Sequence, residues 1–237
     1  MDLRRLAANW AILRERVERA AARSASPRAP VTLISVTKTV PAEAVAALHA
    51  LGARDFGENR VMAGLEKKRA CAFAETGPDA VRWHLIGHVQ TNKAKMAVAF
   101  PAIHSVDSTR VADALERHAM AAGRSIDVWL EINIASEASK QGAAEGDIPE
   151  LARALERASR LRWRGLMAKA PLAADPESSR PVFRRLREWR DRLMAQRPPG
   201  APPLGLSMGM SGDFEVAIEE GASCVRVGTA IWEGVFG

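Results

Sequence analysis

Eight short apolar segments alternate with helix-like segments along the chain, and this alternation limits the fold more than any other feature of the sequence. The strand-like segments begin near Val31, Asp55, Trp83, Ile103, Val128, Trp163, Leu204 and Val225. Strands that alternate with helices favour a parallel sheet, because each parallel connection needs a long crossover. Eight such units predict an α/β fold of the closed (β/α)8 TIM-barrel type.

Helical patterns fill the intervals between these strands. They cover residues 42–51, 59–72, 90–100, 109–122, 148–159, 176–196 and 213–220. Asp147 and Asp175 are suited to N-cap positions, and glycines follow three of the helices at Gly52, Gly123 and Gly221. An open doubly wound sheet is the alternative, but no Gly-x-Gly-x-x-Gly turn follows the first strand.

The N-terminal segment forms a further amphipathic helix over residues 3–21. Its apolar positions recur every three or four residues, at Leu3, Leu6, Trp10, Leu13 and Val17. Little sequence follows the eighth strand, so we expect this helix to pack outside the barrel in the place of an eighth outer helix. No linker separates two domains, and we therefore predict a single domain over residues 1–237.

The composition is that of an ordinary soluble globular protein, with 47% hydrophobic and 26% charged residues among 237. There is no apolar run of membrane-spanning length and no signal-peptide pattern, so we expect a cytoplasmic location without a membrane partner. The two cysteines do not indicate a disulfide framework. We can place no metal site, because His84 and His88 lack further ligands at suitable spacing.

The net charge of +6 allows a nucleic-acid-binding protein as one functional class. However, the arginines of 184–192 are interleaved with acidic residues, as on a solvated helix face. The chain has no tyrosine, and its six tryptophans do not lie within basic runs. We therefore expect no nucleic-acid partner and keep this class as an alternative.

Small and hydroxyl-bearing residues follow the last two predicted strands. Met210 and Ser211 follow the seventh strand, and Gly228 and Thr229 follow the eighth. In barrels of this type the loops after strands seven and eight commonly bind phosphate. A lysine, Lys38, ends the first strand at the same rim, where a ligand in a cleft could reach its amine. Two ordinary glycine turns and a solvated lysine are the alternative interpretation.

Several sequence blocks occur in the order found in a known family. They are Ser-Val-Thr-Lys at 35–38, Phe-Gly-Glu-Asn at 56–59, Trp-His-Leu-Ile-Gly at 83–87, Glu-Ile-Asn-Ile at 131–134, Arg-Gly-Leu-Met-Ala at 164–168, Leu-Ser-Met-Gly-Met-Ser at 206–211 and Val-Arg-Val-Gly-Thr-Ala-Ile at 225–231. Gln90, Asn92, Lys93, Glu137, Lys140 and Gly142 extend the pattern. Together these blocks resemble the pyridoxal-phosphate homeostasis proteins, which are single-domain relatives of the barrel half of alanine racemase.

The resemblance implies that the cofactor is pyridoxal 5'-phosphate, held as a Schiff base on Lys38. It places Asn59 on the ring-hydroxyl side and Arg226 against the pyridine nitrogen. Arginine only donates hydrogen bonds, so Arg226 should leave that nitrogen unprotonated and the ring a weak electron sink. We expect Lys38 to be partly buried near Arg226, and Lys67 to lie solvated on a helix.

The function implied by the resemblance is intracellular vitamin B6 homeostasis, without enzymatic activity. The partners would be pyridoxal phosphate and the apo-enzymes that accept it, with the chain itself a monomer. An amino-acid racemase or another weak pyridoxal-phosphate enzyme is the main alternative. Alanine racemase uses a tyrosine from its second domain, and this chain has no tyrosine. Three positions depart from the family pattern: Arg60, His88 and Lys169.

Overall fold

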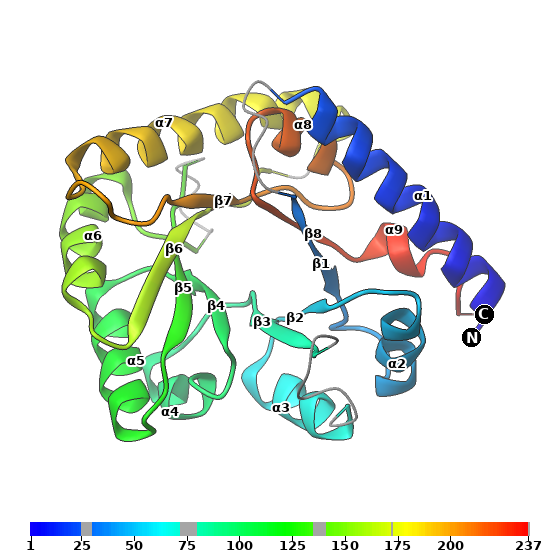
Figure 1. The fold of residues 1–237 in the computed structure, drawn as a ribbon, viewed down its shortest axis with the longest axis horizontal. Helices are drawn as coiled ribbons and strands as arrows, with labels where there is room; N and C mark the ends of the chain where they lie inside the picture. The colour runs from blue at the N-terminus through cyan, green and yellow to red at the C-terminus, as the bar shows by residue number, and fades with distance from the viewer. Residues whose placement is uncertain (25–29, 72–79, 135–140, 172, 237) are drawn as a thin grey trace.

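Eight parallel strands close into one barrel in chain order in the computed structural model (Figure 1). The structure describes residues 1–24, 30–71, 80–134, 141–171 and 173–236. The strands are β1 (Thr32–Val36), β2 (Asp55–Glu58), β3 (Arg82–Leu85), β4 (Ala102–Val106), β5 (Ile126–Glu131), β6 (Leu161–Met167), β7 (Gly205–Ser207) and β8 (Cys224–Val227). The predicted (β/α)8 barrel is therefore confirmed, and each strand begins within two residues of its predicted start.

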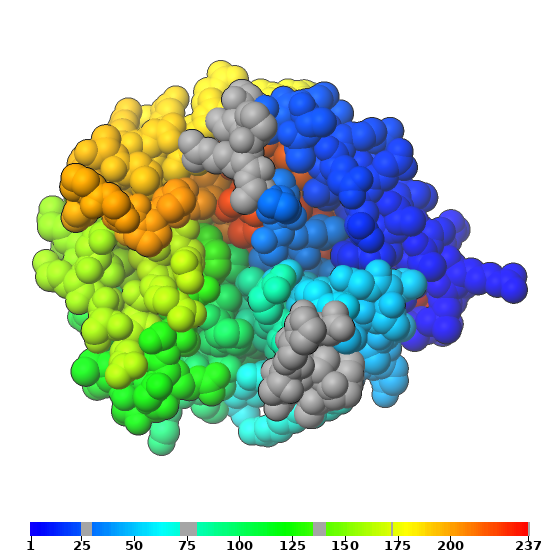
Figure 2. All heavy atoms as spheres, viewed as in Figure 1, coloured from blue at the N-terminus to red at the C-terminus, as the bar shows by residue number. Residues whose placement is uncertain are grey.

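Helices surround the ring of strands on its outside (Figure 1), and in the space-filling view of the same face the N-terminal residues lie at its edge (Figure 2). They are α1 (Leu3–Ala22), α2 (Ala42–Ala50), α3 (Val61–Ala70), α4 (Ala94–Ala97), α5 (Thr109–Ala121), α6 (Ile148–Arg157), α7 (Arg180–Gln196), α8 (Phe214–Glu219) and α9 (Thr229–Trp232). Short 3-10 turns precede three of them: η2 (Thr91–Lys93), η3 (Glu145–Asp147) and η4 (Pro176–Ser179). The helix predicted over 90–100 is thus divided into a 3-10 turn and a single α-helical turn.

The two predicted aspartate caps behave differently. The Asp175 carboxylate accepts the backbone N–H of Glu177 over 3.0 Å, as an N-cap does. Asp147 is the residue before α6, but its side chain makes no capping hydrogen bond. Its backbone is already helical (φ −88°, ψ −13°) because the turn η3 runs directly into α6, whereas a side-chain cap needs an extended backbone.

Glycines end three helices, as the sequence predicts. The backbone after α2, α5 and α8 turns into the left-handed region, where a residue with a Cβ is strained. The three residues and their φ angles are Gly52 (97°), Gly123 (63°) and Gly221 (96°).

Helix α1 lies along α8 and α9, in the outer position predicted for it (Figure 1). The Asn9 side-chain amide donates to the carbonyl of Ile231 over 3.0 Å and to that of Glu233 over 2.9 Å. The Trp10 indole N–H donates to the carbonyl of Leu51 over 2.9 Å. These bonds satisfy carbonyl groups at the ends of α2 and α9, so α1 closes the outer layer of the barrel.

The apolar stripe of α1 is buried except at its first member. Leu6, Trp10, Leu13 and Val17 are between 0% and 8% exposed. The prediction for Leu3 was wrong, because its side chain is 58% exposed. Leu3 is the first residue of α1.

The basic surface carries many ion pairs. Arg180 on α7 pairs with Glu177 at 2.6 Å and with Glu219 at 2.7 Å, and Arg187 pairs with Glu220 at 2.6 Å. These arginines are therefore held by acidic partners, as expected for a solvated helix face. Within the described ranges, no helix is both long enough and apolar enough to cross a lipid bilayer.

Candidate functional site

The seven residues predicted from the sequence gather on one arc of the barrel rim. The strands β7, β8, β1 and β2 are consecutive neighbours in the ring, so their C-terminal ends lie side by side. Arg226 lies within β8, and the others follow these four strands directly: Lys38, Asn59, Met210, Ser211, Gly228 and Thr229. Barrel closure thus brings together residues that are separated by up to nearly the full length of the chain.

Ser211 joins the loops after β7 and β8. Its hydroxyl oxygen accepts the backbone N–H of Gly228 over 3.2 Å and that of Ala230 over 3.4 Å. The hydroxyl hydrogen of Ser211 remains available to donate to a ligand. Thr229 is exposed at the first position of α9, so its hydroxyl lies at the surface of the same loop.

The loop after β7 is stabilised from within. The backbone N–H of Met210 donates to the Asp213 carboxylate over 2.6 Å, and the backbone N–H of Asp213 returns a bond to the Met210 carbonyl over 3.1 Å. Asp213 is 9% exposed and also accepts from the Ser179 hydroxyl over 3.1 Å. These bonds hold Ser211 in place at the rim.

Two glycines of the rim are required by close packing. A Cβ on Gly87 would lie 2.0 Å from the carbonyl oxygen of Asn59, and a Cβ on Gly228 would lie 3.2 Å from the Cβ of Val36. The first separation is impossible for any other residue, so Gly87 allows the chain after β3 to approach Asn59. This contact fixes the backbone of Asn59 against the neighbouring strand end.

Asn59 is half-buried and follows β2 directly. Asn59 could also have served as the N-cap of the next helix, but the structure shows that it does not. Helix α3 begins two residues later, and its N-cap residue is Arg60. The Asn59 side chain is therefore not committed to capping, and Arg60 is exposed beside it.

Lys38 lies in the turn after β1 and is exposed, so the expectation of partial burial was wrong. The preceding residue is anchored instead. Thr37 is fully buried, and its hydroxyl donates to the Glu58 carboxylate over 2.6 Å. The chain leaves the barrel immediately after Thr37, which places the Lys38 side chain outside the core on a rigid base.

Lys67 was also predicted wrongly, as a solvated helix lysine. Its side chain is only 12% exposed. The ammonium group donates to the Glu58 carboxylate over 2.6 Å and to the Thr37 carbonyl over 2.5 Å. A lysine on α3 thus fixes the backbone beside Lys38, which the sequence did not indicate, because the two residues lie on different elements.

Arg226 is buried, at 3% exposed, and points to the carbonyl and hydroxyl groups of neighbouring strand ends. Its Nη1 donates to the Ser207 hydroxyl over 2.7 Å, and its Nη2 donates to the Ala168 carbonyl over 3.0 Å. Burial lowers the pKa of the guanidinium, an effect that Glu131 and Asp213 oppose. The Nε–H makes no hydrogen bond to any residue that the structure describes.

Two of the three positions that depart from the family pattern contact acidic side chains. Lys169, next to Ala168, pairs with Glu131 at 2.7 Å, and the Glu131 side chain is only 2% exposed. His88 pairs with Asp107 at 3.2 Å. Glu137 and Lys140, which belong to the same family pattern, lie outside the described residues.

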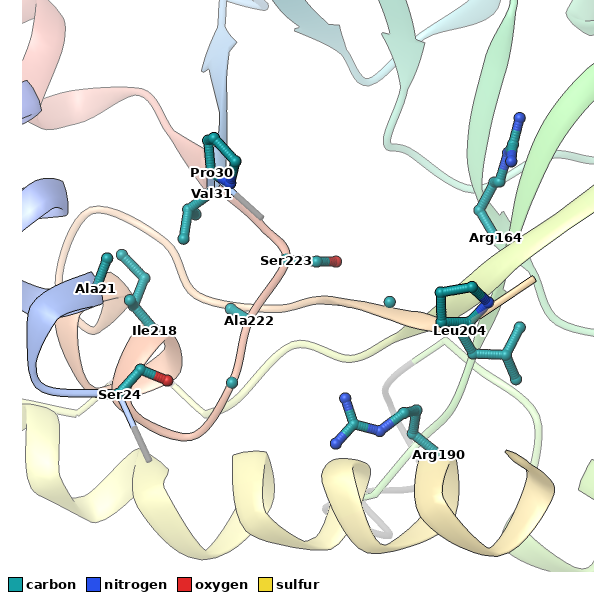
Figure 3. A pocket seen from close by; sticks show the side chains of 13 residues that line it. Ala21, Ser24, Pro30, Val31, Arg164, Arg190, Leu204, Ile218, Ala222 and Ser223 are labelled. Carbon is teal, nitrogen blue, oxygen red and sulfur yellow. The ribbon is translucent and has the colours of Figure 1, made fainter. Parts of the chain in front are cut away.

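Two hollows of the surface lie away from this arc. Figure 3 shows a cavity of about 280 Å³ at the N-terminal ends of the strands, into which Arg190 points from α7. A more open hollow of about 630 Å³ lies between the loops after β3 and β4. None of the seven predicted residues lines either hollow. Among the described residues, no three histidine, cysteine or acidic side chains are placed to hold a metal ion.

Comparisons with known proteins show the family of the chain. Residues 1–234 match the family model of the alanine racemase N-terminal domain. The chain is 40% identical over 228 residues to the pyridoxal phosphate homeostasis protein of Pseudomonas aeruginosa, covering 96% of this chain and 94% of that protein. It is 38% identical over 233 residues to the protein of the same name from Escherichia coli K12, covering 96% and 95%. The chain belongs to the pyridoxal phosphate homeostasis protein family.

A solved structure shares the fold of this chain. The structure of PipY from Synechococcus elongatus PCC7942 with pyridoxal phosphate bound has a TM-score of 0.76 and 34% sequence identity. The match covers 95% of this chain and 99% of PipY. The family blocks recognised in the sequence therefore correspond to a barrel that is shared along almost its entire length.

Proposed function

We propose that this chain binds pyridoxal 5'-phosphate at the arc formed by β7, β8, β1 and β2. The observation that carries the proposal is Arg226, a buried guanidinium that keeps its Nε–H uncommitted while its other nitrogens hold neighbouring groups. This Nε is not one of the fully buried side-chain atoms that lack a partner among the described residues, so a ligand acceptor can meet its N–H. The pyridine nitrogen of the cofactor is such an acceptor.

The surrounding residues fit the remaining parts of the cofactor. The phosphate would meet the linked loops after β7 and β8, where Met210, Ser211, Gly228 and Thr229 supply hydroxyl and backbone N–H donors. Asn59, whose side chain is free of a capping role, would bind the ring-hydroxyl side. When bound, the cofactor supplies an aldehyde that can form a Schiff base with the exposed amine of Lys38.

The proposed role is vitamin B6 homeostasis by a monomeric single-domain barrel, residues 1–237, that holds the reactive aldehyde and passes it to apo-enzymes. Two features of the chain favour binding of the cofactor without catalysis. A donor at the ring nitrogen keeps the cofactor a weak electron sink, and the chain contains no tyrosine to act as a second acid or base. The exposure of Lys38 supports the same role, since its amine is open to exchange with an incoming partner.

Reduction with borohydride tests the proposal. The purified chain is loaded with pyridoxal phosphate, reduced, digested and mapped by mass spectrometry. We expect the reduced cofactor on Lys38 and a visible absorption band that Lys38→Ala abolishes. Attachment mainly to another lysine in the wild-type chain, or an unchanged band in Lys38→Ala, would contradict the proposal.

A further inference from the structure

A row of buried polar side chains crosses the barrel interior from its N-terminal end toward Arg226. At the N-terminal end of the barrel, Arg82 donates to both carboxylate oxygens of Asp55, over 2.7 and 2.5 Å. Asp55 Oδ1 lies 3.0 Å from His84 Nε2, and His84 Nδ1 lies 3.0 Å from His104 Nε2. Asp55 and His84 are 6% and 7% exposed and His104 is fully buried, so water does not replace these contacts.

The row continues without a break to the candidate site. His104 Nδ1 lies 2.8 Å from the hydroxyl oxygen of Ser207, which also accepts from Arg226 Nη1 over 2.7 Å. Ser207 is fully buried at the end of β7. The His104 ring stacks on Trp129 at 3.9 Å between ring centroids, with 9° between the planes, so its orientation is fixed by packing as well.

We propose that Ser207 and His104 are positioning residues that hold Arg226, and that the hydrogen atoms of this row all point from Arg226 toward Asp55. In this arrangement Arg226 donates to Ser207, Ser207 to His104, His104 to His84, and His84 to Asp55. Both histidines are then neutral and carry their hydrogen on Nε2.

The direction follows from the two ends of the row. Arginine can only donate, and an ionised carboxylate can only accept. The carboxyl of Asp55 is kept ionised because hydrogen bonds from His84 and Arg82 lower its pKa against the opposing effect of burial. His84 must therefore carry hydrogen on Nε2, and a neutral His84 then accepts at Nδ1 from His104. His104 in turn offers Nδ1 as the acceptor for the Ser207 hydroxyl.

An additional proton on His84 would reverse the direction of the hydrogen bonds between His84, His104 and Ser207. A doubly protonated His84 would donate to His104, whose hydrogen would move to Nδ1, and Ser207 would lose its acceptor. Burial lowers the pKa of His104 well below its usual value, and the charge of Arg226 acts in the same direction, so the His104 ring stays neutral in either arrangement. Cys224, whose thiol lies nearby in β8, has its pKa raised by burial and stays neutral.

The row therefore explains how Arg226 is held in the barrel interior. Ser207 is the only side chain among the described residues to which Arg226 donates, and the hydroxyl keeps that orientation because His104 takes its hydrogen. This part of the inference rests on the proposed function, because a fixed Arg226 matters only if its Nε–H binds the pyridine nitrogen of the cofactor. The hydrogen arrangement itself does not depend on any cofactor.

Nitrogen-15 NMR of the labelled chain without cofactor tests the arrangement directly. Two-bond correlations between ring nitrogens and carbon-bound ring protons show which nitrogen carries hydrogen. We expect Nε2–H and unprotonated Nδ1 for both His84 and His104 at pH 7.5. Hydrogen on Nδ1 of either ring would overturn the proposal, and this result is independent of whether the chain binds pyridoxal phosphate.

The positioning role is tested with Ser207→Ala and with His104→Phe, which keeps a ring over Trp129 but removes the acceptor. We expect each to weaken retention of pyridoxal phosphate about tenfold. With cofactor labelled at the ring nitrogen, the pH at which this nitrogen takes up a proton should rise by about one unit. Ser207→Thr keeps a hydroxyl, so its cofactor retention and the protonation of the ring nitrogen should both match those of the wild type.

Ser35→Ala is the matched control, because Ser35 is also a fully buried strand serine but its hydroxyl has no described partner. It should leave the retention of the cofactor and the nitrogen signal at wild-type values. Equal effects of Ser207→Ala and Ser35→Ala, or a ring-nitrogen signal unchanged in Ser207→Ala and His104→Phe, would overturn the positioning role. A wild-type chain that binds no cofactor would instead contradict the proposed function.

Discussion

The hydroxyl of Ser211 accepts the backbone N–H of Gly228, and this 3.2 Å bond joins the loops that follow the last two strands of the barrel. The bond makes one structural unit of two segments that the sequence shows as separate turns. Two consequences follow for a phosphate at this point. The bond fixes the two loops relative to each other, and the loss of Ser211 affects both of them.

Ser211→Ala combined with Thr229→Ala should weaken the retention of pyridoxal phosphate more than that of pyridoxal. Each hydrogen bond to a charged phosphate oxygen contributes about 1.5–3 kcal/mol, or roughly tenfold to a hundredfold in affinity. Equilibrium dialysis with both ligands measures the difference. Equal weakening for the two ligands would place the phosphate elsewhere.

Lys38→Ala should leave the free energy of unfolding within about 0.5 kcal/mol of wild type, because the side chain is exposed. Lys67→Ala is the informative comparison. It removes the partner of a buried carboxylate, Glu58, and should cost about 3 kcal/mol or more. Urea unfolding of both variants measures these values, and similar stabilities would show that the Lys67 pair does not anchor the rim.

Leu6→Ala and Leu3→Ala separate the buried and exposed parts of the apolar stripe on α1. Leu6 is fully buried, so its truncation should lower the free energy of unfolding by about 2–5 kcal/mol. Leu3 is 58% exposed, and its truncation should change stability by less than about 0.5 kcal/mol. If the two substitutions have the same effect, α1 does not pack as described.

The chain should not exchange the α-hydrogen of amino acids rapidly. Incubation of the cofactor-loaded protein with L-alanine in heavy water, followed by mass spectrometry, measures this exchange. Arg226 donates to its neighbours and cannot hold a proton on the pyridine nitrogen, so little deuterium should enter the α-carbon. Rapid incorporation would favour the racemase alternative over the carrier role.

Acid should destabilise the chain through His104. Its pKa is lowered in the folded state, so in the unfolded state the same ring takes up a proton as the pH falls below about 6.5 while the folded state does not. The contribution of His104 to the free energy of unfolding is therefore fully present above this pH. It declines below this pH, by up to about 1.4 kcal/mol per pH unit.

Thermal unfolding between pH 7.5 and 5.5 measures this decline. His104→Phe should make the dependence on pH shallower, whereas His118→Asn on the outer helix α5 should leave it unchanged. The same slope in wild type and His104→Phe would show that another group causes the loss of stability.

Local patterns in the sequence were enough to predict the barrel and the rim positions of the candidate site residues. Strand and helix periods are local properties, since side chains alternate along a strand and repeat every 3.6 residues along a helix. They were sufficient to locate the eight strands and therefore the rim position of Lys38, Ser211 and Gly228. The same local reasoning correctly assigned the Asp175 cap and the glycines that end three helices.

The pairing of polar side chains, in contrast, could not be predicted before the folded barrel was known. Ser207 and His104 are 103 positions apart, and Lys67 reaches Thr37 from a different element, so no sequence period connects them. The burial of an individual side chain also depended on whether another element packs against it, as the exposed Leu3 and the exposed Lys38 show. Local patterns describe how the backbone folds, whereas hydrogen-bond partners and desolvation arise when the closed barrel brings distant residues together.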